Sequence, residues 1–185
     1  MQQLKTDLSK YNNDWYNPGG RIKRIVWYSI NSLFFKNAMF IFGGVKISIL
    51  RMFGAKIGTG VVIKPNVNIK YPWLLEIGNN VWIGEEVWID NLAMVKLGDN
   101  SCISQGAMLL CGNHNYKKVS FDLVVRGIEL EEGAWVGAHA VVCPGIKCKS
   151  HSILTVNSVA TTHLEPYMIY QGNPAVQIKE RVFKS

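Results

Sequence analysis

A period of six residues runs from residue 57 to residue 154 and constrains the fold more than any other feature. An α-helix repeats about every 3.6 residues and a strand every two, so neither explains this spacing. Three six-residue units can close one triangular coil, with one aliphatic side chain of each unit on the axis. We therefore predict an all-β fold, a parallel β-helix of about five coils over residues 56–165. The axial positions are Ile57, Ile63, Ile69, Ile77, Ile83, Ile89, Leu97, Ile103, Leu109, Leu130, Val136, Val142, Cys148 and Leu154, and Cys148 alone is not aliphatic.

The period is interrupted in three places. It slips by two residues between Ile69 and Ile77, and again between Ile89 and Leu97. Both slips predict short insertions at corners of the triangle. The third interruption, residues 110–127, is polar and aromatic, and we predict a protruding loop there. Excursions from a repeat scaffold are where function tends to lie.

The two ends of the chain do not follow the period. We divide the chain into an N-terminal helical cap segment, residues 1–55, the β-helix, and a C-terminal tail, residues 166–185. Apolar residues at mixed three- and four-residue spacing within residues 21–53 predict one or two helices. We favour a cap over the open end of the coil, because terminal repeats need cover. Peripheral contact with a membrane surface is the alternative for this segment.

Charge is concentrated in the N-terminal segment. Residues 1–56 hold nine Lys and Arg against two Asp and Glu, which accounts for the whole net charge of +7. A neutral body with one basic end argues against nucleic-acid binding and favours anionic lipid or a locally anionic ligand. We find no secretory signal and no apolar run of spanning length. We expect a cytoplasmic protein, with peripheral contact at the inner membrane face left open.

Cysteine and histidine spacing predicts no metal site. The four cysteines have no C-x-x-C spacing, and we expect reduced thiols. His139, His151 and His163 each lie three positions after a residue of the axial row, namely Val136, Cys148 and Ala160. Successive histidines therefore lie on different faces of the triangle and cannot converge on one metal ion.

His114 is the one histidine outside the repeat, in the long loop. A neutral imidazole near its ordinary pKa of about 6.5 is well suited to removing a proton from a hydroxyl at neutral pH. A loop histidine bonded to backbone is the other interpretation, and the residues alone leave both open.

Several motifs together give the chain a family resemblance. They are Tyr11-Asn-Asn-Asp-Trp-Tyr, Ile77-Gly-Asn-Asn-Val-Trp-Ile-Gly, Gly112-Asn-His-Asn-Tyr, Gly133-Ala-Trp-Val-Gly-Ala, Val142-Cys-Pro-Gly-Ile and Gly172-Asn-Pro-Ala. With these motifs the chain is similar to the hexapeptide-repeat acetyltransferase superfamily, which includes galactoside and maltose acetyltransferases, and most similar to the colanic-acid-type exopolysaccharide O-acetyltransferases. The resemblance implies a left-handed coil, a homotrimer with active sites between subunits, acetyl-CoA as co-substrate, and His114 as the catalytic base in a catalytic loop, residues 110–127.

The resemblance also implies roles for other residues. Backbone amides of Gly137 and Ala138 are expected to stabilise an oxyanion. Asp90 and Asn91 match acceptor contacts, although corner structure explains them equally well. The acetyl-CoA positions are Trp135, Gly137, Ala138, Val156, Thr161, Lys179 and Arg181, and the acceptor positions are Asp90, Asn91 and Asn113.

Two positions depart from the family pattern. Val176 stands where a cation commonly follows Asn-Pro-Ala, and Thr162 replaces the lysine of a Thr-Lys pair. We expect these changes to affect the nucleotide end of CoA and not the type of reaction.

The predicted activity is acetyl-CoA-dependent O-acetylation of a sugar or polysaccharide-precursor hydroxyl, by direct transfer. Two alternatives remain: a sugar-nucleotide N-acetyltransferase of the same superfamily, and a catalytically silent β-helix that serves as a scaffold.

Overall fold

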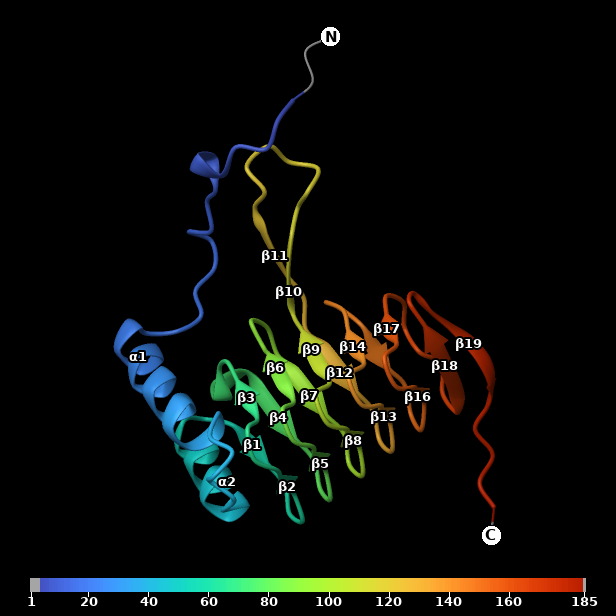
Figure 1. Cartoon of the computed structure of the whole chain (residues 1–185). Helices are drawn as coiled ribbons and strands as arrows, with labels where there is room; N and C mark the ends of the chain where they lie inside the picture. Colours follow the sequence, from blue (N-terminus) through green and yellow to red (C-terminus); the bar gives the residue numbers. More distant parts are fainter. Residues whose placement is uncertain (1–3, 185) are drawn as a thin grey trace.

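A computed structural model describes residues 4–184 and contains a parallel β-helix with helices at one end (Figure 1). Five complete coils stack along the axis, so the coil predicted from the six-residue period is confirmed. The coils contain, in order, β1 (Lys56–Ile57), β2 (Val62–Ile63) and β3 (Asn68–Ile69); β4 (Leu75–Ile77), β5 (Trp82–Ile83) and β6 (Trp88–Asp90); β7 (Val95–Leu97), β8 (Cys102–Ile103) and β9 (Met108–Leu110); β12 (Ile128–Leu130), β13 (Trp135–Val136) and β14 (Val141–Val142); and β15 (Lys147–Cys148), β16 (Ile153–Leu154) and β17 (Val159–Ala160).

Equivalent strands of successive coils pair in parallel and form three faces. Face A is β1-β4-β7-β12-β15, face B contains β2-β5-β8-β13-β16, and face C is β3-β6-β9-β14-β17. The axial side chains form the core, and Ile83, Ile103 and Val136 are fully buried. Asn80 and Asn100 take positive φ angles at corners, which asparagine tolerates better than most residues.

The C-terminal tail contains a strand pair that the period did not reveal. β18 (Met168–Gly172) extends face B beyond the fifth coil, and β19 (Ala175–Glu180) pairs with it in antiparallel orientation. The six-residue spacing ends before β18, and an antiparallel pair follows a two-residue alternation instead.

All three interruptions of the period lie at one corner, between face C and face A. The first contains the short helix η3 (Pro72–Leu74), and the second is residues 91–94. The third is the protruding hairpin of β10 (Gly112–His114) and β11 (Leu123–Val125), which rises above the coil in Figure 1. The predicted protruding loop is confirmed and is a paired hairpin.

Helices cover the first coil. They are α1 (Arg21–Ile30), a continuing π-helical turn η2 (Asn31–Phe35) and α2 (Gly43–Met52). Trp27 is buried, and its Nε1 donates to the carbonyl of Ile69 over 2.9 Å. Lys46 is buried too, and its Nζ donates to the carbonyl of Lys64 over 2.9 Å. Among residues 4–184, no helix is both long and apolar enough to cross a membrane.

Residues 4–20 lie apart from this helical cover and run along the hairpin (Figure 1). The segment includes a short 3-10 helix, η1 (Leu8–Lys10). The backbone N–H of Asp7 donates to the carbonyl of Val119 over 2.8 Å, and the hydroxyl of Tyr16 donates to the carbonyl of Leu92 over 2.7 Å. The start of the expected cap segment therefore packs on the loop instead.

The three faces differ in the side chains that they present outward. Face A carries an alternating charged row, in which Lys56 and Glu76 are 2.7 Å apart and Lys96 lies 3.8 Å from Glu76. The outward rows of faces B and C are mainly apolar and include Val62, Trp82 and Trp135 on face B and Trp88, Met108 and Val141 on face C.

Candidate functional site

His114 is held on the hairpin by two contacts with Phe121. Its Nδ1 lies 2.9 Å from the carbonyl oxygen of Phe121, and the two rings stack with centroids 4.5 Å apart and an interplanar angle of 6°. A carbonyl can only accept, so this bond assigns the proton to Nδ1 and leaves the lone pair of Nε2 available. Phe121 has a φ of 52°, which is uncommon for a residue with a bulky side chain. The turn thus places this carbonyl where it orients the imidazole.

Two predicted acceptor residues lie close to the base of the hairpin. Asn113 is exposed, and its Oδ1 accepts from the backbone N–H of His114 over 2.8 Å. The side chain of Asp90 is 13% exposed, and its Oδ1 lies 2.9 Å from Nζ of Lys70. A Cβ placed on Gly112 would come within 3.7 Å of Oδ2 of Asp90, so this carboxylate adjoins the first hairpin strand.

Asn91 belongs to the corner and not to the acceptor site. It is fully buried, and its Oδ1 accepts from the backbone N–H groups of Lys70 and Tyr71. Its Nδ2 donates to the carbonyls of Tyr71 and Leu74. Both amide hydrogens are used inside the protein, so this residue has no group to offer a sugar, and its prediction as an acceptor contact is corrected.

The predicted acetyl-CoA residues gather mainly at the corner between faces B and C. Trp135 is 43% exposed on face B, and its Nε1 donates to the hydroxyl of Ser104 over 2.9 Å. Gly137 and Ala138 form the turn that follows. Val156 occupies the same turn of the next coil and is exposed.

Only one of the two proposed oxyanion amides is available. The N–H of Gly137 donates to the carbonyl of Leu154 over 2.7 Å, as part of the coil, so its prediction as an oxyanion donor is corrected. A Cβ at Gly137 would come within 2.7 Å of the backbone nitrogen of Val156, so glycine is required here for stacking of the coils. The N–H of Ala138 has no backbone partner among residues 4–184 and remains a candidate donor.

The remaining predicted CoA residues are spread toward the C-terminus. Thr161 is exposed just after β17, and Lys179 is exposed on β19. Arg181 has a structural role: its Nη1 donates to the carbonyls of Gly133 and His151 over 3.0 and 3.1 Å. These bonds attach the end of the chain to the coil and reduce what Arg181 can offer to a phosphate.

Within one chain, His114 and Trp135 do not converge. The hairpin leaves the corner between faces C and A, and face B is the side of the triangle opposite that corner. The hairpin emerges between the third and fourth coils, and Trp135 and Ala138 belong to the fourth coil. The two groups therefore lie at the same height along the axis but on opposite sides of it.

A polar pocket, here called the hairpin pocket, lies beside the base of the hairpin and has a volume of about 580 Å³. Its lining includes Asn13 and Asp14 from the N-terminal segment and Leu123 from β11. Leu123 is the direct cross-strand partner of His114, so both side chains lie on the same face of the hairpin. Clustered amide and carboxylate groups of this kind suit the hydroxyls of a sugar.

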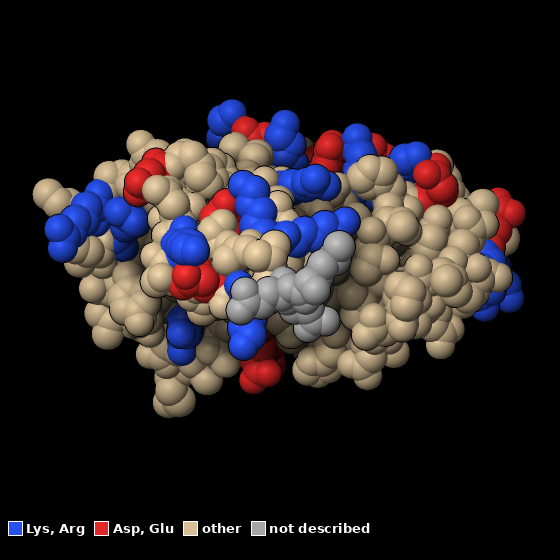
Figure 2. Space-filling view, turned by 90° about the horizontal axis from the view of Figure 1, so that it is seen from above, with Lys and Arg blue, Asp and Glu red and all other residues tan. Residues whose placement is uncertain are grey.

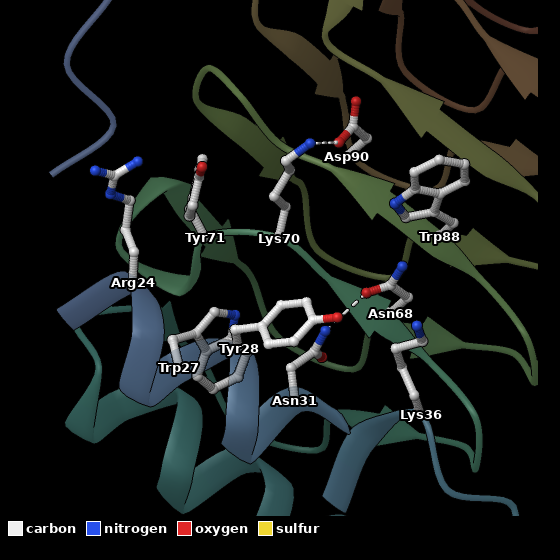
Figure 3. Close-up of a pocket in the computed structure, with 10 residues that line it drawn as sticks. All are labelled: Arg24, Trp27, Tyr28, Asn31, Lys36, Asn68, Lys70, Tyr71, Trp88 and Asp90. Carbon is white, nitrogen blue, oxygen red and sulfur yellow. Dashed lines mark hydrogen bonds and ion pairs between the residues drawn. The ribbon is translucent and has the colours of Figure 1, made fainter. Parts of the chain in front are cut away.

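A second pocket of about 310 Å³, here called the helix pocket, lies between α1 and face C (Figure 3). Its lining includes Arg24, Lys36, Lys70, Trp88 and Asp90, and Figure 3 shows Lys70 pointing toward Asp90. Figure 2 views the molecule from above, and Lys and Arg side chains gather at its helical end and over its middle.

Sequence reasoning gave no role at this site to three residues that lie in or near it. Tyr11, whose ring centroid lies 5.9 Å from that of His114, belongs to a motif noted only for its resemblance. Arg24 and Lys70 appeared only as part of a basic segment and of a corner. Their places depend on how the N-terminal segment packs against distant coils, which no local pattern encodes.

Neither a cluster of metal ligands nor a reactive thiol is found beside the hairpin in the described part of the chain. Within residues 4–184, no group of three or more His, Cys, Asp or Glu side chains is placed to hold a metal ion. Burial raises the pKa of the Cys111 thiol to about 11, so this thiol near the hairpin is not a nucleophile at neutral pH.

Comparison with known proteins identifies the family. No family model matches the sequence. WcaF of Escherichia coli strain K12, named for acetyl transfer in colanic acid biosynthesis, is 32% identical over 167 residues, which cover 90% of this chain and 92% of WcaF. The chain belongs to the hexapeptide-repeat acetyltransferase family.

Solved structures of this acetyltransferase family have the same fold. A hexapeptide-repeat acetyltransferase from Vibrio cholerae, solved with acetyl coenzyme A, aligns with a TM-score of 0.77 at 16% identity over 88% of both chains. A galactoside acetyltransferase solved with coenzyme A aligns with a TM-score of 0.76 at 21% identity, over 87% of this chain and 82% of that one.

Proposed function

We propose that this acetyltransferase moves the acetyl group of acetyl-CoA to a hydroxyl of a sugar or polysaccharide precursor, with His114 as general base. The observation that carries the proposal is the bond from His114 Nδ1 to the carbonyl of Phe121, which leaves Nε2 free to accept a proton. The name of WcaF as an acetyltransferase and the coenzymes bound in the related structures support the choice of acetyl donor.

The proposed reaction is direct transfer in a ternary complex. Nε2 of His114 takes the hydroxyl proton while the oxygen attacks the thioester carbon, and a tetrahedral oxyanion forms. The free N–H of Ala138 is the candidate donor to this oxyanion. When the carbon–sulfur bond breaks, the proton passes from His114 to the departing sulfur, so an ester and CoA are formed.

We propose further that the active unit is a homotrimer with sites between subunits. Each site takes His114 from one copy and Trp135 and Ala138 from another, because they lie on opposite sides of a single coil at the same height. The apolar outward rows of faces B and C favour burial between copies, whereas the charged row of face A suits solvent. The proposed acceptor residues are Asp90 and Asn113.

The acetyl donor is proposed to follow the corner between faces B and C. Trp135 and Val156 offer exposed apolar surface, and the small residue Ala138 allows close approach to the backbone. Thr161 and Lys179 lie toward the C-terminal coils, where the nucleotide end is expected, and Arg181 retains only part of its guanidinium for this purpose.

Peripheral membrane contact through α1 remains a separate proposal, as does a cytoplasmic location. Ile22 and Tyr28 are 79% and 71% exposed on this helix, beside the cations Arg21 and Lys23. An amphipathic helix of this kind can lie in a lipid interface. Sedimentation with anionic vesicles tests the contact, and unchanged recovery in the supernatant refutes it.

The His114→Ala variant tests the catalytic proposal. We expect kcat to fall by about 10² to 10⁴ with an unchanged KM for acetyl-CoA. CoA release, read with a thiol reagent, measures the rate, and His163→Asn is the matched control because His163 is exposed on the coil. Wild-type turnover in His114→Ala refutes the proposal. If the wild-type protein acetylates only amino sugars, the result favours N-acetyl transfer. If it acetylates no glycan at all, the result favours a scaffold.

Mixed trimers test the shared site. His114→Ala and a blocking variant, Ala138→Trp, are each expected to be inactive. When equal amounts of the two variants co-assemble at random, about one quarter of the sites are intact. Half of the subunits supply an intact His114, and in half of those cases the neighbouring subunit supplies an intact Ala138. A site built within one chain regains nothing on mixing.

A further inference from the structure

The hairpin pocket and the helix pocket share a wall. Arg24, Lys70 and Tyr71 line both of them. The hairpin pocket starts beside Leu123, the partner of His114, and the helix pocket continues beyond the shared wall toward Trp88. An acceptor with its reacting hydroxyl near His114 can therefore extend over this wall into the helix pocket.

The helix pocket is cationic. Three cations, Arg24, Lys36 and Lys70, and one carboxylate, Asp90, line it, so the formal charge is 3 − 1 = +2. Lys70 is already paired with Asp90 at 2.9 Å, which leaves Arg24 and Lys36 as the uncompensated charges. A partly enclosed site with this balance attracts an anion.

Arg24 also has an unused donor at this pocket. Its Nε is buried and has no hydrogen-bond partner in the described part of the chain. A buried donor without a partner is costly, and an oxygen atom of a ligand would remove that cost. The guanidinium offers donors in a planar fork that matches phosphate and carboxylate. Lys23, its neighbour on α1, is instead placed over the ring of Trp73, with Nζ 4.4 Å from the centroid.

We propose that the acceptor is anionic and that Arg24 binds its phosphate or carboxylate group in the helix pocket. This inference rests on the proposed acetyl transfer, and it makes Arg24 a specificity-determining residue some distance from the reacting hydroxyl. The anion is either a phosphate that links the sugar to its carrier or the carboxylate of a neighbouring acidic sugar. Both present the same oxygen atoms to Arg24.

Kinetics with matched acceptors test the proposal. A neutral oligosaccharide, its uronic-acid counterpart and a sugar nucleotide are compared with wild type, Arg24→Gln and the control Arg21→Gln, which removes an exposed charge from the same helix. We expect wild type to prefer one anionic acceptor by about 10- to 100-fold in kcat/KM, the value of one charge-assisted hydrogen bond. Arg24→Gln loses this preference through KM, and Arg21→Gln keeps it. No preference in wild type, or an equal loss on neutral and anionic acceptors, overturns the proposal.

Binding of inorganic pyrophosphate tests the pocket without any transfer reaction. Thermal unfolding is measured with saturating CoA, so that the phosphate sites of the acetyl donor are occupied. We expect pyrophosphate to raise the melting temperature of wild type and Arg21→Gln, but not of Arg24→Gln. No stabilisation of wild type, or equal stabilisation of Arg24→Gln, contradicts the pocket assignment. If no acceptor is acetylated, the proposed function fails while this measurement still decides whether the pocket binds anions.

Discussion

Replacement of Asn91 by alanine separates structure from acceptor binding at the insertion corner. Asn91 makes four hydrogen bonds of 2.5 to 3.1 Å. In the variant, the N–H of Lys70 keeps the carbonyl of Ile89 as partner and the carbonyl of Tyr71 keeps the N–H of Leu74, but the N–H of Tyr71 loses its partner. Lost bonds and one orphaned buried donor together cost about 3 kcal/mol. This is a large share of a typical stability of about 5–15 kcal/mol.

Urea unfolding followed by tryptophan fluorescence, at fixed protein concentration, measures this loss. We expect Asn91→Ala to lower the free energy of unfolding by about 3 kcal/mol while the acceptor KM of the remaining folded enzyme is unchanged. Wild-type stability together with a raised acceptor KM would show that our assignment of Asn91 to the corner is wrong.

The isosteric variant Asn91→Asp provides a second test, in which the loss of stability depends on pH. It replaces a donating nitrogen with an oxygen that faces the carbonyls of Tyr71 and Leu74. The buried carboxylate is disfavoured, so its folded pKa lies above the unfolded value of about 3.9. Between the unfolded and the folded pKa, the folded state binds more protons than the unfolded state. The difference in unfolding free energy between wild type and Asn91→Asp therefore shrinks as the pH falls. A deficit independent of pH refutes this account.

Three further predictions follow from buried groups. Burial lowers the pKa of Lys46, so the unfolded chain binds more protons than the folded chain as the pH approaches 10.5, and wild type gains stability there relative to Lys46→Met. Urea unfolding at neutral and alkaline pH measures this gain, and an equal stability difference between the two proteins at both pH values refutes it. Burial raises the pKa of Cys111 to about 11 and that of Cys148 to about 12, so neither thiol should react with a thiol reagent at neutral pH before denaturation, and a full native thiol titre contradicts this. Gly137→Ala should destabilise the fold by about 1–3 kcal/mol, because the added Cβ meets the backbone nitrogen of Val156; an unchanged melting temperature with lost activity would instead assign Gly137 to the chemistry.

The coil was predictable because its cause is local and repeated. Each axial residue, such as Ile83 or Val136, satisfies the same packing requirement at the same spacing, so the sequence displays it many times. The strands β18 and β19 were not predicted, because a single antiparallel pair produces no repeated spacing in the sequence. The same spacing also located the hairpin, since an interruption is visible only against a regular background.

The candidate site was only partly predictable. His114 stood out because it lies outside the period, but its orientation depends on a carbonyl seven residues away that is turned by the backbone of Phe121. Asn91 looked like a ligand contact because a motif position does not reveal whether a polar side chain points inward. Arg24 appeared only as one cation of the basic N-terminal segment, because its place at the pockets depends on segments distant in the sequence.

The single corner that accepts every insertion has a consequence for how such enzymes diversify. Strand pairing on all three faces resumes in register after the excursions of residues 70–74, 91–94 and 111–127. New lengths of chain can therefore be added at this edge without disturbing the axial packing that stabilises the scaffold. Exchange of these excursions between homologues offers a route to altered substrate choice that leaves the proposed acetyl-donor site, at the corner between faces B and C, unchanged.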